Sequence, residues 1–344
     1  MISRGGIIYT HMARHNRIYQ IDLFRFLAAF GVLIYHYTFR GPVSGMSSVG
    51  FEEIGDFFKY GIFGVHLFFI ISGFVIPLSI ENGSVRKFII SRITRLYPAY
   101  WFCVIFTFLV ILFWGNPFYS ATVHQLIANL TMVQKYLGVE DIDGVYWSLL
   151  VELKFYALII LFLLMNKKFN ISLERATACW LVITLLLAPF LNSGSHLIRV
   201  INFFAIGQWS SFFIAGIVFY LIYSKGMSYK YLGMLTISLA VSLYNILYNL
   251  EIGIQALNEG FHTFFSPRIV CGLITMLYVV FFLTCTHKLQ PINSPKLLKL
   301  GILTYPLYLI HENVGFILFN HSAGITNKYI ILIVIILLMF ILAS

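Results

Sequence analysis

Long, continuous apolar segments recur along the whole of this 344-residue chain. A helix needs roughly 20 apolar residues to cross the hydrocarbon core of a bilayer. Because these segments lack the polar–apolar alternation of a membrane β-barrel, they predict an all-α, polytopic membrane helix bundle. About ten transmembrane helices are expected, at residues 21–39, 57–80, 97–114, 144–164, 176–192, 202–223, 231–250, 268–286, 300–320 and 328–343.

The composition excludes the other broad classes of protein. Hydrophobic residues make up 60% of the chain and charged residues only 10%, whereas an ordinary soluble domain is about 25% charged. An aromatic content of 17% argues against disorder. The net charge of +10 does not indicate nucleic acid, because cytosolic loops of membrane proteins carry a similar excess of Lys and Arg. The predicted partner is therefore the lipid bilayer and not nucleic acid.

The distribution of Lys and Arg predicts the orientation. With a cytosolic N-terminus, 15 of these cations fall on inner segments and 6 on outer segments, which matches the positive-inside rule. Both termini are then expected in the cytosol, and the protein in the cell's inner or plasma membrane. The apolar run after Arg4, Arg14 and Arg17 is not followed by a convincing signal-peptide cleavage site, so an uncleaved first span is expected.

The loops between the predicted spans are short, which leaves no room for a separate soluble domain. The expected organisation is a cytosolic N-terminal segment at 1–20 and a single transmembrane domain at 21–344. The cysteines show no metal-ligand spacing, so no metal site is predicted and they are interpreted as small buried hydrophobic residues. They are Cys103, Cys179, Cys271 and Cys285.

Ionisable residues within spans are costly in a bilayer and indicate functional sites by default. Arg25 and His36 lie eleven residues apart in the first span, which places them on one helix face about 16 Å apart along the axis. Arg25 could instead extend to the inner interface and pair with Asp22. His36 could instead be an interfacial residue.

Three more spans carry polar groups inside apolar runs. His66 lies in the second span, as a site residue or a packing residue. A lone Glu152 in the fourth span would be protonated or paired with a cation. In the ninth span, Tyr305, Tyr308 and His311 form one stripe, either of packing aromatic residues or of site residues.

Two arginines precede the third span at a spacing of three residues, and therefore share a helix face. Arg92 and Arg95 could anchor the protein to anionic lipid at the inner surface. They could also hold a phosphorylated cytosolic ligand, because paired guanidinium groups match phosphate oxygens.

Five short motifs follow one another along the chain. They are Arg25-x10-His36, Leu67-Phe-Phe-Ile-Ile-Ser-Gly-Phe74, Arg92-x-x-Arg95-x-x-Pro98, Trp147-Ser148-x-x-x-Glu152-x-x-Phe155-Tyr156 and Tyr305-x-x-Tyr308-Leu-x-His311. Each is weak alone, but in this order on a ten-span chain they resemble the acyltransferase-3 family of membrane acyltransferases. The resemblance runs from about residue 20 to the last span.

The resemblance implies O-acyl transfer, with acetyl as the expected group, from cytosolic acyl-CoA to a sugar hydroxyl of an exported or lipid-linked polysaccharide of the cell envelope. His36 would act as general base, because the unperturbed pKa of histidine lies near working pH. Glu152 would orient a histidine, and the catalytic set would also include His66 and His311. Acyl-CoA, the donor, would be held by Arg92 and Arg95, with help from Arg25.

Some members of that family carry an extracytoplasmic esterase-like domain, and none is expected in this sequence. A partner protein, an oligomer or a different final acceptor is therefore expected. The alternative function is a multi-span transporter or flippase of a small molecule or lipid-linked sugar, because polar groups through a bundle also suit transport. The absence of an internal repeat argues against it.

Overall fold

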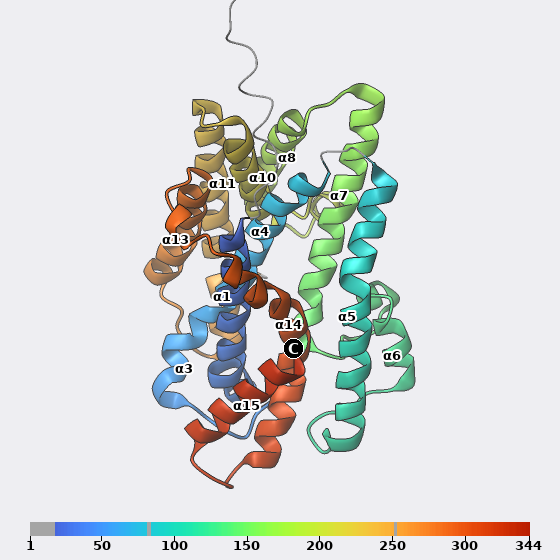
Figure 1. Cartoon of the computed structure of the whole chain (residues 1–344), viewed down its shortest axis with the longest axis vertical. Coiled ribbons are helices and arrows are strands. Elements are labelled where there is room, and N and C mark those ends of the chain that lie inside the picture. Colours follow the sequence, from blue (N-terminus) through green and yellow to red (C-terminus); the bar gives the residue numbers. More distant parts are fainter. Residues whose placement is uncertain (1–17, 81–83, 251–252) are drawn as a thin grey trace, which may run out of the picture.

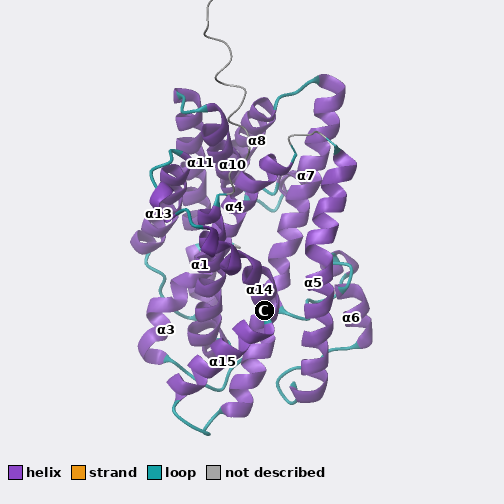
Figure 2. Cartoon of the chain, viewed as in Figure 1, coloured by secondary structure: helices purple, strands orange, loops and turns teal. Residues whose placement is uncertain are grey.

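The computed structural model describes residues 18–80, 84–250 and 253–344. Most of the predicted cytosolic segment, with Arg4, Arg14 and Arg17, therefore lies outside the described residues. Within these ranges the chain contains helices and no strands (Figure 2). Nine helical segments are long and apolar enough to cross a membrane, which confirms the predicted all-α, multi-span bundle.

The helices are joined by short connections. The shorter elements are α2 (Gly41–Val43), α3 (Glu52–Phe58), α6 (Val123–Asn129) and α12 (Ile254–Phe261). The longer ones are α1 (Tyr19–Tyr35), α4 (Gly64–Ser79), α5 (Val85–Trp114), α7 (Trp147–Phe169), α8 (Leu173–Leu187), α9 (His196–Ala205), α10 (Ser210–Lys225), α11 (Tyr229–Tyr248), α13 (Pro267–Cys285), α14 (Leu298–Ser322) and α15 (Lys328–Leu342).

Two predicted spans differ from the structure in length. The segment predicted at 97–114 is the second half of the 30-residue α5, because the basic stretch before it is also helical. The segment predicted at 328–343 is the 15-residue α15, which at 1.5 Å per residue is about 22 Å long and shorter than the hydrocarbon core. The described residues thus contain nine candidate spans instead of the predicted ten.

Small polar residues begin several of these helices. The side chains of Ser84, Ser172 and Ser228 each accept a hydrogen bond from a backbone N–H in the first turn of α5, α8 and α11. Such N-caps satisfy donors that the helix itself leaves without an acceptor. The basic residues after Ser84 therefore belong to the helix and are held in register with it.

The helices α1, α4, α10 and α14 form the centre of the bundle. Figure 1 shows α5 and α7 on one side of them and α11 and α13 on the other. Most side chains of α10 are buried, and α4 packs closely along it. We call the end where α1 begins the N-side and the opposite end, where α3 lies, the far side.

Two glycines allow α4 and α10 to pack this closely. A Cβ atom added at Gly216 would lie 2.7 Å from the Cα atom of Gly73, so neither position has room for a side chain. Close backbone approach at small residues is a common basis of helix packing in membranes.

We expect Gly216→Ala to destabilise the protein by about 1–3 kcal/mol, because the added methyl group forces the two backbones apart. Thermal unfolding in detergent measures the effect. Gly233→Ala is the matched control, since a Cβ at Gly233 in α11 meets nothing within 4 Å. The control should be neutral or stabilising because alanine is the better helix former. Equal unfolding temperatures for the two variants would contradict the close approach.

The four cysteines are free, but the prediction that all are buried is wrong. Cys103 and Cys285 are buried, whereas Cys179 is exposed and Cys271 partly exposed. The latter two lie on the outward faces of α8 and α13, where an apolar thiol can contact lipid as readily as protein.

Candidate active site

The far end of α1 continues into a single π-helical turn, His36–Arg40. Such turns are rare and occur frequently at functional sites. The turn directs His36 towards α14, where its Nδ1 atom lies 2.8 Å from Nε2 of His311. Both residues are buried. We call them the histidine pair.

The hydrogen bonds around the histidine pair define its tautomers. Nδ1 of His311 lies 2.9 Å from the carbonyl oxygen of Tyr308, so it carries a hydrogen and leaves Nε2 as an acceptor. His36 must then donate from Nδ1, and its Nε2 is an acceptor that faces the Arg40 guanidinium at 3.2 Å. His36 therefore presents one basic nitrogen, and His311 fixes the ring that carries it.

A buried carboxylate lies beside that nitrogen. Oε1 of Glu312 is 3.7 Å from His36 Nε2 and 3.0 Å from the Arg40 guanidinium. Glu312 is almost fully buried, and Arg40 retains a quarter of its side-chain exposure. If His36 takes up a proton at Nε2, the resulting imidazolium faces this carboxylate, which stabilises the charge.

A second acid completes this group. The Asp143 carboxyl neighbours that of Glu312, and burial together with this second acid raises the pKa of Asp143 well above its usual range. It also accepts hydrogen bonds from the backbone N–H groups of Val145 and Asn313. Two buried carboxyl groups in contact cannot both be ionised easily. Together the two acids are therefore expected to carry one negative charge, which lies opposite Arg40.

On the N-side, three arginines surround one cavity of about 110 Å³. It shares lining residues with a neighbouring cavity of about 670 Å³ near the start of α1. Arg25 and Arg95 line both, and Arg92 lines the inner one. We call the two together the arginine cavity.

The arginines of this cavity are only partly satisfied by the protein. A guanidinium nitrogen of Arg25 lies 3.6 Å from Asp22, the pairing that its i,i+3 spacing allows. Arg92 is about nine-tenths buried, lies against the rings of Phe88 and Tyr156, and has a buried Nε atom with no hydrogen-bond acceptor among the described residues. A buried guanidinium with a free donor favours an anionic ligand.

Glu152 lies in the arginine cavity. Its Oε1 atom accepts hydrogen bonds from Ser72 at 2.9 Å and from Tyr156 at 2.5 Å. The predicted role of Glu152 was to orient a histidine, but the carboxylate beside His36 is Glu312. Glu152 instead positions two hydroxyl groups and offsets one of the three positive charges.

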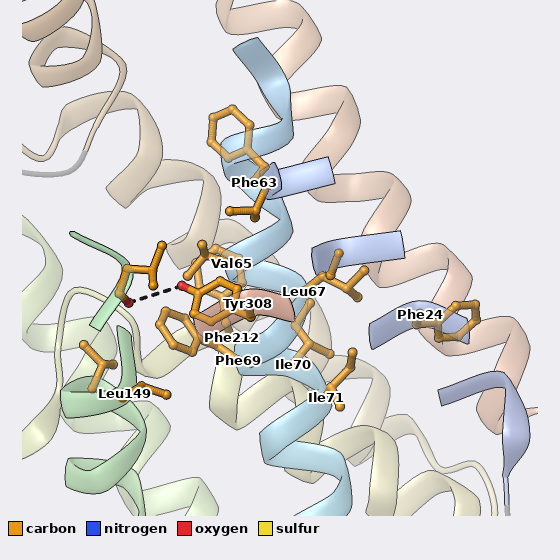
Figure 3. Packing of buried hydrophobic residues seen from close by; sticks show 14 of the residues in the cluster. Phe24, Phe63, Val65, Leu67, Phe69, Ile70, Ile71, Leu149, Phe212 and Tyr308 are labelled. Atoms are coloured by element: carbon orange, nitrogen blue, oxygen red, sulfur yellow. Dashed lines mark hydrogen bonds between the residues drawn. The ribbon is translucent and has the colours of Figure 1, made fainter. Parts of the chain in front are cut away.

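Tyr308 separates the arginine cavity from the histidine pair. Its side chain lines the cavity, its hydroxyl lies 2.7 Å from Ser148 Oγ, and its backbone carbonyl binds His311. Figure 3 shows the Tyr308 ring among apolar residues that include Val65 and Phe69. A ligand that extends from the arginines towards His36 must therefore pass this ring.

His66 lies apart from both groups. Its ring contacts Phe63, Trp209 and Phe212 at centroid distances of 4.7–5.4 Å, and it lines a cavity of about 240 Å³ together with Trp147. These contacts place His66 apart from His36, and its catalytic role stays a prediction.

Arg40, Glu312 and Asp143 are not among the site residues predicted from the sequence. Two signals were present: Arg40 is four residues after His36, and Glu312 directly follows His311. Asp143 gave no comparable signal. Among the described residues no cluster of three His, Cys, Asp or Glu side chains is placed to hold a metal ion.

Comparison with known proteins identifies a family to which the sequence is similar. The family model described as an acyltransferase domain matches residues 18–344. A protein of Acidianus two-tailed virus, named provisionally as an acetyltransferase, is 22% identical over 262 residues, which cover 74% of this chain and 73% of the viral protein. No solved structure matches.

Proposed function

This chain belongs to the acyltransferase domain family and is a multi-pass membrane acyltransferase, and from that premise we propose that it transfers an acetyl group from acetyl-CoA to a sugar hydroxyl. The N-side would face the cytosol, as the excess of Lys and Arg suggests, in an inner or plasma membrane. The acceptor would be an exported or lipid-linked glycan that approaches from the far side.

One observation carries the proposal. The arginine cavity opens on the N-side and reaches Tyr308, which in turn contacts the histidine pair. A long donor with an anionic head and a narrow acyl-bearing arm suits this layout, because its phosphates can reach the arginines while its thioester approaches His36. Acyl-CoA has that shape and charge.

The proposed chemistry uses residues of the histidine pair and its neighbours. His36 Nε2 takes the proton of the sugar hydroxyl as the oxygen attacks the thioester carbonyl carbon. The carbon–sulfur bond then breaks, and the imidazolium returns its proton to the departing thiolate. Glu312 stabilises the transient imidazolium, and His311 keeps the ring in the required tautomer, as in other base–orienter pairs.

Transfer from radiolabelled acetyl-CoA by purified protein tests this function. Acetyl-CoA hydrolysis or exchange without acceptor, and labelled glycan with acceptor, are the expected results. A transporter or flippase should show neither activity. Mass spectrometry of envelope glycans from a deletion strain identifies the acceptor through loss of acetylated species, and unchanged glycans would contradict the proposed acceptor class.

The arginine cavity yields a binding prediction. We expect the double variant Arg92→Ala, Arg95→Ala to bind acetyl-CoA about 100-fold more weakly in nanodiscs, since each lost charge-assisted contact costs roughly tenfold in affinity. Arg86→Ala, Lys87→Ala removes the same charge from exposed positions on the same helix. Unchanged binding in the cavity variant, or equal losses in both, would show that these arginines do not hold the donor.

A further inference from the structure

A second polar site lies beside the break between α9 and α10, away from the arginine cavity and the histidine pair. A hollow of about 510 Å³ is lined by residues of α7, α9 and the segment that follows α9. Its polar and aromatic side chains are Trp147, Lys154, Arg199, Asn202, Phe203, Gln208 and Trp209. We call it the Lys154 hollow.

The chain is broken beside this hollow. The sequence predicts one span at 202–223, but α9 ends at Ala205 and α10 begins at Ser210. Ile206 between them is left-handed, with φ +56°, which is unfavourable for a β-branched residue. The Ala205 carbonyl accepts a hydrogen bond from the Trp180 indole in the middle of α8. Irregular backbone at membrane depth persists where protein covers it or where it lines a cavity, and broken helices often build substrate sites in membrane proteins.

Two cations face the hollow. The Lys154 amine lies 4.2 Å from the centre of the Phe203 ring, and one guanidinium nitrogen of Arg199 donates to the Gly194 carbonyl at 3.3 Å. Within the part of the chain that the structure describes, no carboxylate forms an ion pair with either cation. A lysine within a span is costly to insert, so this pair favours an anion from outside the chain, and a phosphate suits both groups.

An apolar groove runs beside the hollow. It has a volume of about 490 Å³, and α7, α8 and α9 contribute residues that include Phe155, Leu158, Trp180 and Phe204. Helix α9 presents Arg199 and Asn202 to the hollow and Ile201 and Phe204 to the groove. An anionic head in the hollow and an alkyl chain in the groove would therefore belong to one amphiphilic molecule.

The remaining residues of the hollow suit a sugar. Trp147 and Trp209 lie 5.4 Å apart and offer flat apolar faces, and the amide side chains of Asn202 and Gln208 match hydroxyl groups. The same two tryptophans also line the cavity that His66 lines. Val65 lines that cavity as well as the arginine cavity. A sugar held here would lie on a series of cavities that leads towards the donor.

We propose that the Lys154 hollow and the apolar groove bind the acceptor as a lipid-linked sugar, with its phosphate on Lys154 and Arg199 and its hydrocarbon chain in the groove. This inference rests on the proposed function, because it names the form in which the acceptor reaches the enzyme. A soluble glycan would use neither the groove nor the two cations.

Direct binding of geranylgeranyl-phosphate-linked glucose to the full chain tests the site. In phosphatidylcholine nanodiscs, quenching of tryptophan fluorescence reports the affinity. We expect the double variant Lys154→Gln, Arg199→Gln to bind this probe at least about tenfold more weakly, and the swapped variant Lys154→Arg, Arg199→Lys to bind within about threefold of the wild type. Arg268→Gln, at an exposed position where α13 begins, is the control.

Competition against the bound probe distinguishes a lipid-linked sugar from an ordinary anionic lipid. Phosphatidylglycerol carries a phosphate without a sugar, and octyl glucoside carries a sugar without a phosphate, so both should displace the probe poorly. Equal displacement by phosphatidylglycerol would overturn the assignment in favour of a general site for anionic lipid. Unchanged probe affinity in the Lys154→Gln, Arg199→Gln variant would overturn the site itself.

Acetyl-CoA hydrolysis, measured on the same preparations, separates this inference from the proposed function. If the site is correct, the Lys154→Gln, Arg199→Gln variant keeps the hydrolysis rate of the wild type while its KM for the lipid-linked acceptor rises. Probe binding without any acetyl-CoA turnover would contradict the transferase reaction but not the lipid site. Turnover with an unaltered acceptor KM would contradict the lipid site alone, and preserved hydrolysis also shows that the variant is folded.

Discussion

Replacement of His36 by alanine is expected to reduce acetyl transfer by about 10²–10⁴-fold, the usual contribution of a general base. The variant loses Nε2, the basic nitrogen that remains because Nδ1 donates to His311, and that faces Arg40. Acetyl-CoA affinity should stay near that of the wild type, because His36 lies beyond Tyr308 from the arginine cavity. Initial rates of acetyl transfer by protein in nanodiscs, with binding measured in parallel, give both values.

A second substitution separates the base from its structural role. In His36→Asn the side-chain amide can still donate to His311 but cannot accept a proton at the Nε2 position. We expect this variant to be as inactive as His36→Ala while it unfolds at nearly the wild-type temperature. A well-folded and active His36→Ala protein would exclude His36 as the base.

Hydropathy predicts most of the fold because each span must be apolar whether it faces lipid or its neighbours. Hydropathy fails to predict the length of a helix, or a break within it, where these depend on tertiary structure. The first part of α5 is helical but polar, so a search for apolar segments does not find it. The only sequence evidence for the break after Ala205 is a glycine and a glutamine, at 207–208, inside an apolar run. The final apolar segment forms a helix too short to cross.

The candidate site is harder to predict from the sequence than the fold is. The eleven-residue spacing links Arg25 in α1 with His36 at the start of the π-helical turn. Arg25 lines a cavity together with Thr304 of α14, and His36 contacts His311 of the same helix. Residue spacing could not identify which carboxylate lies beside His36. Glu152 is conspicuous because it is isolated in an apolar run, whereas Glu312 stands beside His311, and only the packing of α14 against the π-helical turn reveals that Glu312 reaches His36.

Glu312 therefore carries the other large expected effect. Replacement by glutamine keeps the size of the side chain but leaves the Arg40 guanidinium without its negative partner. Loss of one member of a buried ion pair costs about 3–5 kcal/mol, and we expect the lower end because Arg40 is a quarter exposed. Activity should fall by at least about tenfold, since the imidazolium of His36 loses its stabilising charge. Thermal unfolding in detergent and initial rates of acetyl transfer measure the two effects.

A double-mutant cycle separates stability from catalysis at this position. The variant Glu312→Gln, Arg40→Gln removes both charges, so it should recover much of the stability that Glu312→Gln alone loses. Its activity should stay low, because no carboxylate then faces His36. Recovery of activity along with stability would show that Glu312 only neutralises Arg40. Low stability in the double variant would mean instead that the Glu312 carboxyl supports the fold through a neighbour other than Arg40, such as Asp143.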